Sequence, residues 1–163
     1  MRIYSNSYAL AVAVALLIAS VLLGVYYAAL MPEQEGYMTV YVLDSQKKAF
    51  DYPEVVVAGE NSTFSVYVTV ENHMGNTTAC QIRLKVTKDM NPTFPVDVDV
   101  NATETFVATV DDGKTWEIPP TTISLNEPGD YLVVFELWIG QSAENTETFQ
   151  FSKDLAVLNV QVL

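Results

Sequence analysis

Hydrophobic residues follow two different patterns along the chain. An unbroken apolar run covers residues 8–30 and contains no charged side chain. From Tyr37 onward apolar and polar residues alternate instead, most regularly over 64–70 and 80–86. A long continuous run predicts an apolar helix, whereas a period of two predicts strands with one buried and one solvent-facing side. We therefore expect one N-terminal helix followed by an all-β region.

The run at residues 8–30 is long enough to cross a membrane. At a rise of about 1.5 Å per residue it forms a helix of ~34 Å, against a hydrocarbon thickness of ~30 Å. A cleaved signal peptide has a shorter apolar part and small residues before the cut, where Tyr26 and Tyr27 stand here. We expect a retained signal anchor, with a cleaved signal peptide as the alternative.

Charges beside this run predict its orientation. Arg2 precedes it, and Glu33 and Glu35 follow it. Because positive charge stays on the cytoplasmic side, we expect a cytoplasmic N-terminus and a C-terminal domain outside the cell membrane. The chain then has four parts: residues 1–7 in the cytoplasm, 8–30 in the lipid, a short stem at 31–37, and an extracytoplasmic domain at 38–163.

The alternating region predicts an immunoglobulin-like antiparallel two-sheet sandwich. Asp112-Gly113 between two Thr/Val-rich runs is a hairpin-turn signal, and Tyr131 after Gly129 resembles a tyrosine corner. Gly59 suits a tight turn, and residues 72–76 form a loop that takes the chain to the other sheet. Strands are expected at 38–43, 54–58, 63–71, 79–87, 95–100, 104–110, 115–118, 121–125, 130–139, 146–151 and 154–162.

Charge in the β region is strongly acidic. All 20 acidic residues lie beyond position 32, together with seven of the eight basic ones. This balance argues against nucleic acid as a partner, because its binders need a basic surface. It also argues against a domain that lies on anionic lipid. An acidic, solvated surface is the simpler interpretation.

Residues 40–86 resemble a known family. The resemblance is carried by Tyr52-Pro53, Gly59-Glu60 and Val70-Glu71-Asn72-His73. The stretch is similar to the extracytoplasmic domain of a mostly archaeal membrane-protein family called domain of unknown function 1616. This resemblance implies an archaeal envelope protein with an immunoglobulin-like exterior domain and supplies no activity. The chain differs in having Met74 where the family often has an acidic residue, and one predicted span where many members have several.

Three sequons are candidate glycosylation sites in a domain outside the cell. They begin at Asn61, Asn76 and Asn101, each at a strand end or in a loop. Chance is the alternative, since Asn, Ser and Thr are common in β-loops. We expect a glycan at one or more of them.

No cofactor or metal site is expected. His73 is the single histidine, so a histidine-based zinc or copper site cannot form within one chain. Asp97, Asp99 and Asn101 share a strand face and could bind calcium through oxygen, but a solvated acidic face is the favoured interpretation. Cys80 is in phase with the inward residues, which predicts a buried thiol.

An enzyme is not expected either, because the sequence contains no nucleophile elbow, HExxH motif or phosphate-binding glycine loop. We expect a non-enzymatic, single-pass envelope protein whose sandwich docks a partner such as a surface-layer protein or a membrane-complex subunit. Its candidate contact residues are Tyr67, Trp116 and Trp138, with packing between the sheets as the alternative role.

A filament subunit is the other hypothesis. In this homo-oligomer the apolar helices would bundle in the core, with Ala11, Ala15 and Ala19 on one helical face. The last strand, residues 155–163, could alternatively be donated to a neighbouring sheet. Against a filament, the segment before the helix lacks a prepilin cleavage signal.

Overall fold

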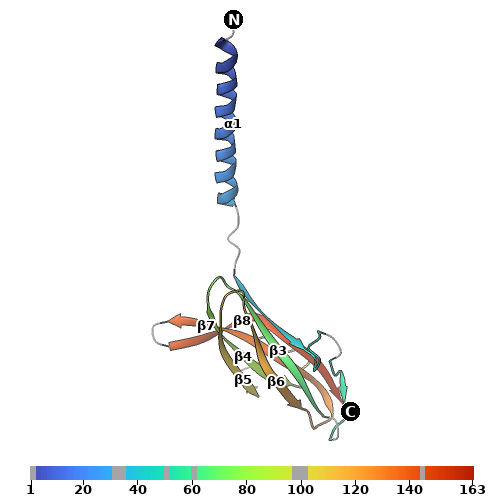
Figure 1. Ribbon diagram of the computed structural model, residues 1–163. Coiled ribbons are helices and arrows are strands. Elements are labelled where there is room, and N and C mark those ends of the chain that lie inside the picture. Colours follow the sequence, from blue (N-terminus) through green and yellow to red (C-terminus); the bar gives the residue numbers. More distant parts are fainter. Residues whose placement is uncertain (1–2, 31–35, 50–51, 60–61, 97–102, 144–145) are drawn as a thin grey trace. The chain divides into compact units, whose positions relative to one another are not determined.

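Figure 1 shows the computed structural model of the protein. The structure describes residues 3–30, 36–49, 52–59, 62–96, 103–143 and 146–163. It divides into two compact units, Met1–Glu35 and Gly36–Leu163.

The first unit is a single helix, α1 (Ile3–Leu30). It begins five residues before the predicted apolar run, and its part Tyr8–Leu30 is apolar enough to span a membrane, with a mean hydropathy of 2.6. The side chains of Tyr8–Leu30 are exposed on all sides. The Ser20 hydroxyl donates to the Leu16 carbonyl (2.8 Å), which satisfies this polar group within the helix.

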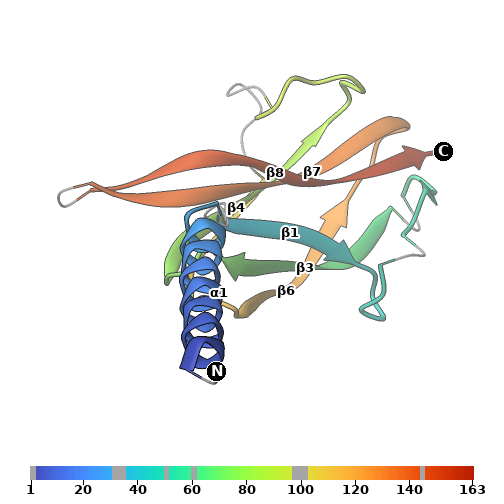
Figure 2. The same ribbon diagram turned by 90° about the horizontal axis from the view of Figure 1, so that it is seen from above.

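The second unit is an immunoglobulin-like sandwich of two sheets (Figures 1 and 2). One sheet has the order β1-β3-β6 and the other β2-β8-β7-β4-β5. Its strands are β1 (Tyr37–Leu43), β2 (Val55–Val56), β3 (Thr63–His73), β4 (Thr78–Thr87), β5 (Glu104–Val110), β6 (Thr115–Ser124), β7 (Gly129–Ala143) and β8 (Thr146–Val162). All pairs are antiparallel, as expected, except β2 with β8, which is parallel.

The core lies between the two sheets and comes from the predicted inward positions. Val66, Val68 and Val70 of β3 are fully buried, as are Cys80 and Ile82 of β4. Asn72 closes one end of the core: its buried amide donates to the carbonyls of Asn76 and Val110. The tyrosine corner is confirmed, since the Tyr131 hydroxyl donates to the Glu127 carbonyl (3.0 Å).

Strand β7 is buried on both faces. Val133, Phe135 and Leu137 point into the core, but Leu132 and Val134 on the opposite face are buried as well. These two residues form a second apolar cluster with Val96, in the segment that follows β4. The predicted strand 95–100 is not seen at residues 95 and 96, and its remainder lies outside the described residues.

The predicted hairpin at Asp112-Gly113 is wrong in its pairing. The chain does turn there, with Gly113 at a φ of 67°. However, β5 before the turn pairs with β4, and β6 after it pairs with β3 in the other sheet. The turn residues allow the chain to reverse, whereas the rows of buried side chains decide which strands pair.

Two pairs of predicted strands are each one continuous strand in the structure. Strand β6 runs through Pro119 and Pro120, which together oppose Tyr67 at a bulge. Proline is tolerated there because β6 is an edge strand. Strand β8 likewise contains both 146–151 and 154–162 and remains within the chain's own sheet.

A bulge in β8 links the two sheets. Three residues, from Ser152 to Asp154, oppose Leu137 alone, and Lys153 takes a φ of 72°. The Ser152 hydroxyl donates to the Leu137 carbonyl (2.8 Å). The Asp154 carboxylate then accepts the backbone N–H of Val40 in β1 (3.0 Å). The bulge therefore directs a side chain of one sheet to the edge of the other.

Candidate functional site

An aromatic and basic surface lies on the outer side of the five-stranded sheet. Cross-strand pairing places Val107, Gln81, Trp138 and Phe151 in one row over β5, β4, β7 and β8. The Arg83 guanidinium lies over the Trp138 ring, 3.8 Å from its centroid. We call these five residues the Trp138 face.

The Trp138 face is held in place by its own contacts. Arg83 Nε donates to Gln81 Oε1 (2.7 Å), and the rings of Trp138 and Phe151 lie 5.7 Å apart. Trp138 Nε1 donates to Glu136 Oε2 (3.1 Å). Val107 remains 54% exposed. The face thus combines an ordered Trp–Arg pair with an exposed aliphatic side chain.

A buried ion pair lies beside this face. Lys85 Nζ is 3.7 Å from Glu136 Oε2, and both residues are almost inaccessible to solvent. Lys85 Nζ also donates to the Val96 carbonyl (2.5 Å), while the Val96 N–H donates to Glu136 Oε1 (2.5 Å). Because each buried charge has a partner, the pair anchors the segment Lys88–Val96 over the outer side of β7.

The other two predicted contact residues lie elsewhere. Tyr67 is half-buried in β3, with Lys47 Nζ 4.9 Å from its ring centroid. Trp116 pairs with the inward-facing Val70 and packs against the core. The three residues therefore do not form one surface, and Trp116 has a packing role.

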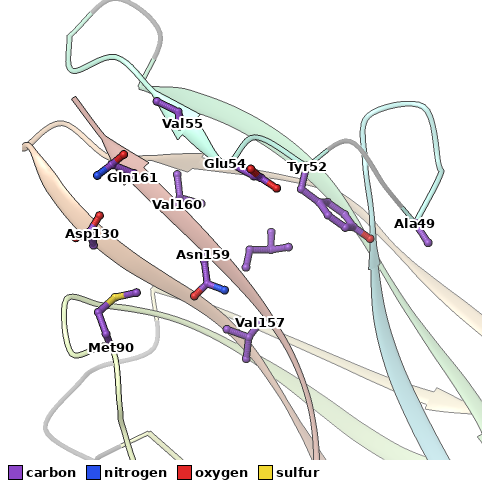
Figure 3. A pocket seen from close by; sticks show the side chains of 11 residues that line it. Ala49, Tyr52, Glu54, Val55, Met90, Asp130, Val157, Asn159, Val160 and Gln161 are labelled. Atoms are coloured by element: carbon purple, nitrogen blue, oxygen red, sulfur yellow. The ribbon is translucent and has the colours of Figure 1, made fainter.

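A groove of about 980 Å³ follows β8 near its C-terminal end (Figure 3). Tyr52 and Glu54 line it beside Val157 and Asn159 of β8. The Tyr52 hydroxyl donates to the Val42 carbonyl (2.6 Å). Burial, and then the nearby Asp44 carboxylate, raise the pKa of Tyr52, so the hydroxyl keeps the proton it donates. The sequence pattern does not predict this groove. The one signal for the groove in the sequence is the Tyr52-Pro53 pair.

The sequons are only partly described. Asn76 is exposed before β4, and its side-chain oxygen accepts the Thr78 hydroxyl (2.9 Å). An exposed asparagine in a loop has room for a glycan. Asn61 and Asn101 lie outside the described residues.

Cys80 lies in a buried setting that does not favour a nucleophile. Burial raises the pKa of Cys80 to about 11, so its thiol is protonated at neutral pH. His73 stacks on Tyr37 (centroids 4.9 Å apart), and its Nε2 lies 3.6 Å from a Glu71 oxygen. Within the described part of the chain, no three His, Cys, Asp or Glu side chains gather to hold a metal ion. The calcium candidates Asp97, Asp99 and Asn101 lie outside that part.

Comparison with known proteins identifies the fold. No protein-family model matches the chain, and no curated protein sequence matches it. Among solved structures, the CARDB domain of a Pyrococcus furiosus protein in complex with di-metal ions is similar, at 14% identity and a TM-score of 0.51. The match covers 80% of this chain and 90% of that one. At this identity the likeness concerns the fold, a CARDB-type, immunoglobulin-like sandwich.

Two other solved structures are less similar. A β-glucosidase from Listeria innocua, in complex with glucose, has a TM-score of 0.48 at 14% identity, over 78% of this chain and 16% of the enzyme. The soluble domain of PmoD from a Methylocystis species has a TM-score of 0.36 at 12% identity, over 77% of this chain and 90% of that domain. These two matches add no evidence on function.

Proposed function

We propose that this protein is a non-enzymatic, single-pass envelope protein whose sandwich docks another protein outside the cell membrane. The observation that carries the proposal is the combination of an apolar, exposed helix with a β-sandwich that presents an ordered Trp–Arg pair. The helix would anchor the chain, and the Trp138 face would hold the partner. The resemblance to the archaeal family of residues 40–86 supports the same placement.

The composition of α1 supports the anchor. An apolar helix of this length meets the thickness of a bilayer, and its backbone polar groups are bonded within the helix, as lipid requires. Arg2 before the helix and Glu33 after it support a cytoplasmic N-terminus.

The chemistry of the Trp138 face supports docking. Tryptophan and arginine are enriched among the residues that carry most of the energy of protein interfaces. Arg83 is already held against Trp138 by the stack and by Gln81. Ordering that precedes binding reduces the entropy lost on association, which favours affinity. We infer that the partner presents an uncharged or acidic surface to Arg83.

The orientation of the chain in the membrane is tested first. Because the chain has a single cysteine, one substitution removes all background labelling. In a Cys80→Ala background, Ser5→Cys and Thr122→Cys each carry one thiol. A membrane-impermeant maleimide applied to intact cells should label Thr122→Cys and not Ser5→Cys, and detergent should make both reactive. Labelling of Ser5→Cys alone in intact cells would reverse the proposed orientation.

Docking is tested by site-specific photo-crosslinking in intact cells. A crosslinking amino acid replaces Val107 on the Trp138 face or, as a matched control, Thr122, an exposed residue of the other sheet. We expect a discrete crosslinked envelope protein from position 107 and none from 122, with the product lost on Arg83→Ala. Equal products from both positions, or none, would contradict docking at this face.

A further inference from the structure

Strand β8 has an unpaired edge inside the groove of Figure 3. The short strand β2 pairs with β8 only at Gln161 and Val162. Among the described residues, no strand pairs with β8 on this side between Leu155 and Val160. Within the described part of the chain, the groove therefore contains a stretch of β8 whose free edge has no paired strand.

The alternation of hydrogen bonds along β8 shows which of its backbone groups face the groove. Gln161 N–H donates to the Glu54 carbonyl (2.8 Å), and Leu163 N–H donates to the Val56 carbonyl (3.0 Å). Odd-numbered residues at this end of β8 thus direct their backbone groups away from β7. Because alternate residues of a strand bond to the same side, the N–H and C=O groups of Val157 and Asn159 face the groove.

Another sheet edge of this protein is closed by its own side chains. On β1, Asp154 accepts the Val40 N–H (3.0 Å), and Tyr52 donates to the Val42 carbonyl (2.6 Å). Exposed edges template unwanted strand pairing, and such caps suppress it. The open edge of β8 lies in a groove, so a single extended chain can reach it more easily than a whole sheet can.

The walls of the groove indicate the chemistry of that occupant. Glu54 and Asp130 place two carboxylates on it, in a chain with a formal net charge of −12. Met90 and Val157 add apolar surface. An extended segment in a sheet directs alternate side chains to opposite sides, so one set can be apolar while the other is charged.

We propose that this groove binds an extended basic peptide segment of another protein, which adds to β8 as a further strand. Its backbone pairs with Val157 and Asn159, its basic side chains approach Glu54 and Asp130, and its apolar side chains point to the opposite side of the sheet. Main-chain pairing supplies affinity and the side chains supply selectivity. The site uses none of the residues of the Trp138 face and requires no membrane, so it stands independently of the function proposed above.

The first test measures binding of a defined probe to the full chain in detergent micelles. The probe is a fluorescein-labelled, amidated hexapeptide of alternating valine and lysine, followed by fluorescence anisotropy. Its control carries N-methyl groups on alternate residues, on the edge that would pair with β8. We expect the control to bind at least about tenfold more weakly, because it loses the ladder hydrogen bonds. Equal binding of both peptides would overturn the proposal.

A matched pair of variants tests the β8 edge. Asn159→Pro removes an N–H that faces the groove and that β7 does not use, whereas Asn159→Ala keeps it. We expect Asn159→Pro to weaken peptide binding about tenfold and Asn159→Ala to change it by less than about twofold. Should Asn159→Pro not fold, hydrogen exchange on the wild-type chain decides: the peptide must slow exchange at Val157 and Asn159, and unchanged exchange overturns the proposal.

Two further measurements test the role of charge and the alternative occupant of the groove. Glu54→Gln with Asp130→Asn should weaken the lysine peptide several-fold and flatten its salt dependence, and a valine–glutamate peptide should not bind. A second copy of this chain is the other occupant of an open edge. A dimer that Asn159→Pro converts to monomer, with no binding of the lysine peptide, would overturn the proposal in favour of self-pairing.

Discussion

Cys80 lies in the core, where its side chain is fully buried in β4. Burial disfavours the thiolate and raises the pKa from 9.0 to about 11. In the unfolded chain the thiol loses its proton near its ordinary pKa. Between these two values the folded state binds more protons than the unfolded state, so the free energy of unfolding falls as pH rises.

We predict that stability declines between about pH 9 and pH 11 by about 2–3 kcal/mol through this group. Urea unfolding of the full chain in micelles, followed by tryptophan fluorescence, measures the decline. Cys80→Ala lowers stability at pH 7 because it leaves a small cavity, and it should remove this part of the decline. Tyrosines and lysines titrate in the same range and are present in both chains, so the difference between the two curves reports Cys80. Parallel curves would contradict the prediction.

At the scale of the elements, the contact between β8 and β1 depends on Asp154. Its carboxylate is the acceptor for the Val40 N–H on the free side of β1. We predict that Asp154→Ala lowers the free energy of unfolding by about 1 kcal/mol, because it removes this hydrogen bond and uncovers the strand edge. The shift in the urea midpoint measures this loss.

Asp154→Asn is the matched control for that variant. Its amide keeps an oxygen that can accept the same N–H, so it should retain most of the stability that Asp154→Ala loses. The uncovered β1 edge should also make Asp154→Ala aggregate faster than Asp154→Asn on mild heating. Identical midpoints for both variants and the wild type would show that the contact does not stabilise the fold.

The strands differ in how far the sequence could predict them. Strands β3 and β4 have one buried face over most of their length, so a period of two predicts them and places Cys80 inward. Strand β7 is covered on both sides, and its burial depends on Val96, far away in sequence. Alternation alone contains no information about such a cover. Glu136 is likewise covered on this side, and Lys85 pairs with it in the interior.

The pairing of the strands and the position of the candidate sites are harder to predict from the sequence, for the same physical reason. Asp112-Gly113 encodes a reversal of the chain, but the choice of partner strand depends on distant rows of buried residues. The groove exists because β2 ends its pairing with β8 after two residues, which is a long-range outcome. Trp138 was predicted as a contact residue from its type alone, and its stack with Arg83 came from cross-strand register.

At the scale of the whole molecule, the sandwich contains its own core. The buried hydrophobic residues extend from Met38 to Val162, and no described side chain of α1 is among them. A domain of this length can bury enough surface to fold alone. The helix instead exposes apolar side chains along Tyr8–Leu30, where lipid can cover them.

We predict that residues 36–163, produced without the helix, fold with a urea midpoint close to that of the full chain and remain in the soluble fraction. The full chain should stay in the membrane pellet after alkaline carbonate extraction. Leu17→Arg, which places a charge at the helix centre at a cost of about 3 kcal/mol, should reduce membrane insertion, and the control Leu17→Ile should not. Circular dichroism and fractionation measure these outcomes. A truncated chain without β structure would show that the helix contributes to folding, and full extraction of the intact chain by carbonate would contradict the anchor.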